Sequence, residues 1–251
     1  MLFIVSNILN KVSFKEIIKK GLIISAIAFV IAGWWFIRNA VIYNGDFLGL
    51  STEKEYAETY AMPEYKPSLI ETPQRKGVSL WYMLQVMDWG INTYLSFIAV
   101  FGYMNILCNY KIYVFFSLIF IAGGIGALFA FKKLFIYNKE KNKDKQKILL
   151  NFTFVFAIII PIILSLYYSY FSDFEPQGRY IMPMLIPFIY FVVYGINNIV
   201  EKFTSIKVIK EKKYTNVIKN ILIAVLCALI IIACLYCLFK VIIPYYKILL
   251  F

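Results

Sequence analysis

Histidine is absent from this chain of 251 residues. Its absence excludes serine–histidine and cysteine–histidine nucleophile pairs, together with zinc, haem and non-haem iron sites that need a histidine ligand. Any acid–base chemistry would therefore fall to aspartate, glutamate, lysine or tyrosine. We accordingly expect no metal site and no cofactor.

Cysteine is also rare, with four residues, and three of them lie within one apolar run. The "CLYC" stretch, Cys234 to Cys237, has the spacing of a CxxC pair, but that run offers no further metal ligand. We interpret these cysteines as helix-packing residues and expect no disulfide framework.

Arginine is scarce beside lysine. The 26 basic residues comprise 23 lysines and the three arginines Arg38, Arg75 and Arg179, and the net charge is +12. Most lysines occupy short segments between apolar runs, where cytoplasmic lysines orient membrane proteins. This pattern favours membrane lipid as a partner, and we expect no nucleic-acid binding.

Apolar residues dominate what is present. They make up 61% of the chain, aromatics make up 19%, and the mean hydropathy is +0.73. A soluble domain is about half apolar, and about 20 apolar residues cross a bilayer as a helix. We predict an all-α, polytopic transmembrane helix bundle. The five expected spans are Gly21–Val41, Ile112–Phe131, Ile148–Ser169, Tyr180–Ile199 and Asn220–Phe239.

The whole chain, residues 1–251, is expected to form a single integral membrane domain. Residues 1–20 alternate apolar residues with lysines, which is typical of an amphipathic helix on the inner membrane surface. Residues 44–111 form a long outer loop, and residues 112–251 form a four-span bundle. In the second span, "IAGGIGALF" places small residues four apart, which favours close helix packing.

The distribution of charge predicts the orientation. With the N-terminus in the cytoplasm, the three inner segments hold 17 of the 26 basic residues. The C-terminus then lies on the extracytoplasmic side of a cell membrane that the chain crosses several times.

Residues 78–107 are apolar enough to suggest a sixth span. Gln85, Asp88, Asn92 and Ser96, however, share one helical face, and a sixth span would place the "NKEKNKDKQK" loop outside, against the charge rule. We therefore predict an interfacial or re-entrant helix that bends near its glycines. On it, Asp88 is either a base or the wet side of an amphipathic helix.

The stretch "SDFEPQGRYIMPMLIP" places Arg179 at the start of the fourth span. Arginine grips phosphate bidentately, a helix N-terminus attracts anions, and Pro183 and Pro187 should disturb the first turns. Two interpretations stay open here: a phosphate seat, or an interfacial anchor that pairs with Glu175.

Arg38 closes the first span in "GWWFIRNAVIYNGDFLG". Its aromatic neighbours are typical of a membrane-interface belt, which favours an anchor. Asn39, Asn44 and Asp46 bring polar groups to the same boundary, which favours a binding site.

These stretches resemble a family of bacterial multi-spanning membrane proteins of unassigned function. The matching segments are "GWWFIRNAVIYNGDFLG", "SFIAVFGYMN" (Ser96–Asn105) and "QGRYIMP" (Gln177–Pro183), in the family's order. Ile98 and Ala99 replace an aromatic–glycine pair, and Asn44 is an extra residue. The family looks like the GT-C class of membrane glycosyltransferases, which take a sugar from a polyprenyl-phosphate carrier. The resemblance covers the later part of such a protein, so the chain is expected to be either a C-terminal portion that lacks the catalytic region or a minimal member of the class.

The resemblance implies hexosyl transfer from a polyprenyl-phosphate-linked sugar, for a cell-envelope polysaccharide or glycolipid. Asp46 and Asp88 are the candidate bases. The alternative is a non-enzymatic membrane subunit, scaffold or transporter of lipid-linked sugars, and either role could involve an upstream or partner membrane chain. The residues expected to bind substrate are Arg179, Gln177, Gly178, Tyr180, Arg38 and Asn39.

Overall fold

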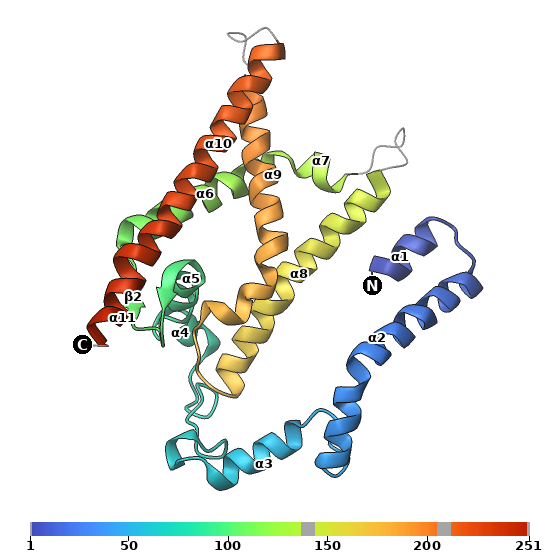
Figure 1. Cartoon of the computed structure of the whole chain (residues 1–251), viewed down its shortest axis with the longest axis vertical. Helices are drawn as coiled ribbons and strands as arrows, with labels where there is room; N and C mark the ends of the chain where they lie inside the picture. Colours follow the sequence, from blue (N-terminus) through green and yellow to red (C-terminus); the bar gives the residue numbers. More distant parts are fainter. Residues whose placement is uncertain (1, 137–143, 205–211, 250–251) are drawn as a thin grey trace.

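The computed structural model of the chain describes residues 2–136, 144–204 and 212–249. Within these ranges the chain is helical apart from turns and one small hairpin (Figure 1). Five helical segments are long and apolar enough to cross a membrane, which confirms the predicted all-α class. They are Phe14–Ile42, Tyr110–Phe129, Lys145–Phe171, Gly178–Phe203 and Val217–Lys247.

The N-terminal segment forms two helices, α1 (Leu2–Leu9) and α2 (Phe14–Ile42). They are separated at Lys11, whose φ of 54° is left-handed, and at Ser13, whose side chain accepts a hydrogen bond from the Glu16 backbone N–H at 3.4 Å. Serine followed three residues later by glutamate is a helix-starting pattern. The predicted continuous helix over residues 1–20 is therefore divided, and residues 14–20 open the first span.

Helix α2 lies apart from the other long helices (Figure 1). Of an apolar stretch of 18 residues within α2, only 6% are buried in the structure. The preceding helix α1 turns back and packs on α8 (Asp144–Phe171). An apolar helix in this position presents its sides to lipid or to another membrane chain, because exposing so much apolar surface to water is energetically unfavourable.

The segment between α2 and α6 (Tyr110–Phe129) contains the short helices α3 (Leu50–Tyr60), η1 (Pro63–Tyr65), α4 (Leu80–Gln85) and α5 (Trp89–Ala99), followed by β1 (Val100–Phe101) and β2 (Ile106–Leu107). It is fastened to the end of α8. There, the Gln74 N–H donates to the Tyr170 carbonyl at 3.2 Å, and the Tyr170 hydroxyl donates to the Val78 carbonyl at 2.9 Å.

The predicted interfacial helix over 78–107 is divided in the structure. It breaks at Asp88, which has a left-handed φ of 57° and precedes α5, and it ends at an antiparallel hairpin whose turn contains Gly102 at φ 63°. The bend therefore falls just before Gly90. The cause is the left-handed backbone at Asp88, a conformation that aspartate adopts more readily than most residues.

The C-terminal half contains α6, α7 (Phe131–Phe135), α8, η2 (Gly178–Met184), α9 (Leu185–Thr204), α10 (Lys212–Tyr236), the π-helical turn η3 (Cys237–Ile242) and α11 (Ile243–Leu249). Helices α6 and α9 approach most closely. A Cβ on Gly195 would lie 1.8 Å from the Gly123 carbonyl oxygen, and one on Gly126 would lie 2.1 Å from the Gly195 carbonyl oxygen. The small-residue pattern of the second span therefore does mediate close packing.

The fourth span begins irregularly, as its prolines predict. The 3₁₀ helix η2 contains Pro183, and the regular helix α9 starts at Leu185, with Pro187 in its first turn. A proline in a first helical turn loses no backbone hydrogen bond, because the first N–H groups have no partner in the helix. The disturbed turns lie between α8 and α9, where they contact both α5 and α8.

Candidate functional site

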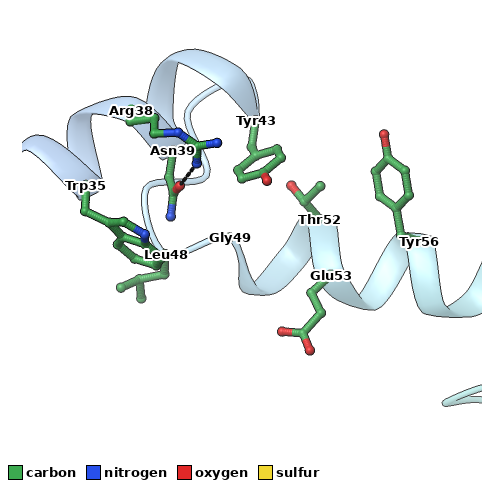
Figure 2. A pocket seen from close by; sticks show the side chains of 9 residues that line it. All are labelled: Trp35, Arg38, Asn39, Tyr43, Leu48, Gly49, Thr52, Glu53 and Tyr56. Atoms are coloured by element: carbon green, nitrogen blue, oxygen red, sulfur yellow. Dashed lines mark hydrogen bonds between the residues drawn. The ribbon is translucent and has the colours of Figure 1, made fainter.

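The structure separates the predicted site residues into two groups. Arg38 and Asn39 line a pocket of about 560 Å³ between the C-terminal end of α2 and helix α3 (Figure 2). The residues from Gln177 to Tyr180 lie in and beside η2. The pocket is lined by Trp35, Arg38, Asn39, Tyr43, Leu48, Gly49, Thr52, Glu53 and Tyr56.

The Arg38 guanidinium is available for a ligand. Its Nη1 donates a long hydrogen bond, 3.4 Å, to the Oδ1 of Asn39, a residue that is 2% exposed. Within the described part of the chain no ion pair joins Arg38 to a carboxylate. An exposed, uncompensated guanidinium retains donors arranged to grip a phosphate or carboxylate.

Helix α3 provides the facing wall of the pocket. Thr52, Glu53 and Tyr56 project from it, and Figure 2 shows them beyond the turn that follows Tyr43. The pocket thus combines a cation, a carboxylate and aromatic rings. Reasoning from the sequence missed Thr52 and Glu53 as site residues, because they line one pocket with Arg38 only once residues 43–49 fold back. In Figure 2 the Glu53 side chain points away from Arg38. The signal of that turn in the sequence was the glycine at position 49, because glycine readily adopts the left-handed backbone, φ 76°, found there.

Asp46 organises this turn. Its oxygens accept hydrogen bonds from the Gly49 N–H at 3.0 Å, the Thr52 N–H at 2.9 Å and the Thr52 hydroxyl at 3.1 Å. These bonds, above all that from the Thr52 backbone, lower the pKa of Asp46 below its ordinary value. A carboxylate that is stabilised in its charged form is a weaker base. The geometry therefore favours Asp46 as the residue that places α3, and its role as a base stays a prediction.

The Asp46 carboxyl should titrate at a lower pH than an ordinary aspartate. Its folded-state pKa lies below 3.8, the ordinary value for an aspartate, so its stabilising bonds are fully present above 3.8 and are lost as pH falls through the lower, folded value. Carboxyl-carbon NMR of the protein in micelles should show Asp46 titrating below 3.8. In Thr52→Val, which keeps the backbone donor, the pKa should rise only part of the way. Titration of wild-type Asp46 at or above 3.8 would contradict the capping geometry.

The second group docks onto α5. The Gly178 N–H donates to the Ser96 hydroxyl at 2.6 Å, and a Cβ on Gly178 would lie 2.2 Å from the Phe97 backbone nitrogen. Only glycine permits this approach. The segments Ser96–Asn105 and Gln177–Pro183, far apart in the sequence, therefore meet at this contact.

Arg179 is already paired in this second group. Its Nη2 lies 3.5 Å from the Glu175 Oε2 and donates to the Tyr180 hydroxyl at 2.9 Å, and the Tyr180 hydroxyl in turn donates to Glu175. The guanidinium also lies 4.9 Å from the centre of the Tyr180 ring. This arrangement matches the anchor interpretation of Arg179. Because Glu175 offsets its charge, Arg179 attracts a further anion less strongly than Arg38 does.

Asp88 belongs to neither group. It is exposed, directly precedes α5, and its side chain accepts no capping hydrogen bond from that helix. Across the described ranges, no three histidine, cysteine, aspartate or glutamate side chains gather as metal ligands would. The role of Asp88 as a base also stays a prediction.

The two groups lie at the same end of the molecule (Figure 1). The Tyr168 and Tyr180 ring centres are 6.0 Å apart, so the end of α8 and the η2 turn pack against each other.

The fold defines an all-α membrane protein with five candidate spans and a polar pocket at the end of the first of them. Comparison of the chain with protein-family models, with curated proteins and with solved structures found no match.

Proposed function

We propose that the pocket beside Arg38 binds the phosphate and sugar of a polyprenyl-phosphate-linked sugar, and that the chain acts as a GT-C-like membrane glycosyltransferase, as the sequence resemblance implies. One observation carries the proposal. Arg38, without a carboxylate partner in the described chain, shares a pocket with the carboxylate of Glu53 at the end of an apolar helix. A lipid-linked sugar phosphate needs this combination of a cation, a base and an adjacent bilayer.

The residues would divide the chemistry between them. An acceptor hydroxyl attacks the anomeric carbon, the bond from that carbon to the phosphate oxygen breaks, and polyprenyl phosphate leaves with the electron pair. Arg38 stabilises the leaving phosphate, and Glu53 receives the proton of the acceptor hydroxyl. Trp35 and Tyr56 offer apolar ring faces to the sugar. The polyprenyl chain extends into lipid along the exposed apolar surface of α2.

We place the pocket on the extracytoplasmic side of the cell membrane. The support is the charge distribution, with lysine-rich segments before the first, third and fifth spans. The pocket lies at the opposite end of the first span from the lysines of residues 11–20. On this orientation the N-terminus is cytoplasmic and the C-terminus extracytoplasmic, and the product is a cell-envelope polysaccharide or glycolipid.

Binding of a short-chain polyprenyl-phosphate hexose in detergent tests the site. We expect Arg38→Gln to raise the Kd by about 10- to 100-fold, which corresponds to the loss of charge-assisted hydrogen bonds of ~1.5–3 kcal/mol. Arg38→Lys should show a smaller rise, because lysine keeps the charge but loses the planar fork.

Two matched variants make this test specific. Lys54→Gln removes the same charge from an exposed position of α3 that does not line the pocket, so its Kd should not change. Arg179→Gln tests the second group. Weak binding in Arg179→Gln with normal binding in Arg38→Gln would move the phosphate site to η2 and overturn the proposal.

A second candidate function is a non-enzymatic subunit or scaffold that handles lipid-linked sugars. The separation of α2 from the helix bundle favours it, because its apolar sides could receive a partner membrane chain. This function predicts that the purified chain binds the carrier lipid with normal affinity but forms no transfer product with any acceptor glycan. Product formation by the chain alone would exclude it.

A further inference from the structure

The hairpin after α5 contacts the last helical segment, Val217–Lys247, through two cysteines that are 129 positions apart in the sequence. The Sγ atoms of Cys108 and Cys237 lie 3.3 Å apart, and both residues are buried, at 8% and 7% exposure. They share one apolar cluster with Ala99, Ile112 and Ala233. The two sulfur atoms therefore face each other inside a packed contact between distant segments.

Hydrogen bonds hold both sides of this contact in position. The Tyr113 hydroxyl accepts from the Cys108 N–H at 3.1 Å and donates to the Ala99 carbonyl at 2.8 Å. Across the contact, the Asn105 side-chain N–H₂ donates to the Tyr245 hydroxyl at 2.9 Å. The hairpin and the last helical segment thus cannot slide past each other without losing polar contacts as well as packing.

We propose that Cys108 and Cys237 form a disulfide that fastens the hairpin to the last helical segment. A disulfide has an S–S length of about 2.05 Å, so the sulfurs need to approach by roughly 1.2 Å. Cys237 is the first residue of the π-helical turn η3, an irregular stretch in which the backbone departs from α-helical geometry. Such a turn can accommodate a small shift more easily than a regular helix.

The reaction is a thiol–disulfide exchange with a disulfide-bearing oxidant, such as a thiol oxidoreductase. One cysteine thiolate attacks the oxidant and forms a mixed disulfide, which releases one thiol of the oxidant. The second cysteine then attacks that bond and releases the other thiol. The two electrons and two protons lost by the protein are thereby gained by the oxidant.

The environment of Cys108 indicates when this exchange occurs. Burial raises the pKa of the Cys108 thiol, and the neighbouring Cys237 adds to the rise. The reactive thiolate is therefore scarce in the packed state. The bond accordingly forms while the hairpin docks during assembly, and packing then protects it from reductants.

The other two cysteines provide an internal contrast. Cys227 and Cys234 are exposed on α10, and neither lies in the contact between Cys108 and Cys237. The oxidising surroundings that maintain a disulfide are expected on the extracytoplasmic side, so the proposal rests on the orientation proposed above. It does not depend on carrier binding or sugar transfer.

Alkylation of the full chain tests the bond. Cells are quenched with acid, the membrane protein is unfolded in SDS with N-ethylmaleimide so that buried thiols also react, and it is then analysed intact by mass spectrometry with and without reduction. Two alkylated cysteines before reduction and four after it are expected, with Cys108 and Cys237 in one linked peptide pair. Each of Cys108→Ser and Cys237→Ser should show three alkylated cysteines under both conditions.

The matched control is the double variant Cys227→Ser with Cys234→Ser. It should show no alkylated cysteine before reduction and two after it, and reduction should lower its Tm by roughly 5 °C, as in the wild type. Four alkylated cysteines in quenched wild-type protein would overturn the proposal. So would a bond that appears only after an oxidant is added to the purified protein. Normal carrier binding in either case would still support the proposed binding function of the Arg38 pocket.

Discussion

Replacing Glu53 with glutamine is expected to lower the rate of sugar transfer by about 10²- to 10⁴-fold while carrier affinity stays nearly unchanged. Glutamine has the same size and lines the pocket in the same way, but it cannot accept the proton of the acceptor hydroxyl. General-base catalysis contributes rate factors of this size. Transfer of radiolabelled hexose from a short-chain polyprenyl-phosphate donor to an acceptor glycan measures the rate, and equilibrium binding of the same donor measures the affinity.

Glu55→Gln is the matched control, because Glu55 is exposed on the same helix and does not line the pocket. Its transfer rate should equal that of the wild type. If Glu53→Gln retains full activity, Glu53 is not the base, and the corresponding variants Asp46→Asn and Asp88→Asn become the next to measure. Equal losses in Glu53→Gln and Glu55→Gln would indicate a general effect on α3 instead of a missing base.

Replacing Gly195 with alanine is expected to force α6 and α9 apart. The new Cβ would lie 1.8 Å from the Gly123 carbonyl oxygen and 2.6 Å from the Ala127 nitrogen. Both are backbone atoms, which cannot rotate away as a side chain can. Overpacking of this kind costs typically 1–3 kcal/mol, and the shift would also strain the 3.1 Å hydrogen bond from the Asn198 side chain to the Gly126 carbonyl. Thermal unfolding in detergent should show a Tm lowered by several degrees.

Gly124→Ala on α6 is the control for this packing effect. A Cβ at Gly124 would meet no atom within 4 Å, so the variant should keep the wild-type Tm or exceed it, since alanine favours helix. Equal Tm values for Gly195→Ala and Gly124→Ala would show that α6 and α9 are less closely packed than their backbones indicate.

The number and type of the long elements follow from local sequence. A bilayer requires about 20 apolar residues per crossing, and it requires backbone hydrogen bonds to be satisfied within each segment. Both requirements act on consecutive residues, so hydropathy predicted all five spans. Pro183 and Pro187 likewise predicted the irregular start of the fourth span, because proline fixes its own φ and lacks a backbone N–H whatever surrounds it.

The finer breaks were not predictable in the same way. The segment 1–20 divides before Ser13, and the segment 78–107 divides at Asp88. Apolar periodicity runs through both breaks without change. A single left-handed residue, such as Lys11 or Asp88, changes the direction of the chain while leaving the periodicity intact.

The candidate site depends on contacts between segments that periodicity does not relate. Arg38 and Arg179 occupy similar positions at the ends of apolar runs, and both were predicted with the same two alternatives. Folding distinguishes them, because Glu175 lies within ion-pair distance of Arg179, whereas α3 turns back to place Glu53 in the pocket of Arg38. The approach of Cys108 to Cys237 likewise spans 129 positions. Local sequence therefore specifies where the chain crosses the membrane, whereas the function of each polar side chain at the boundary depends on the segment that packs against it.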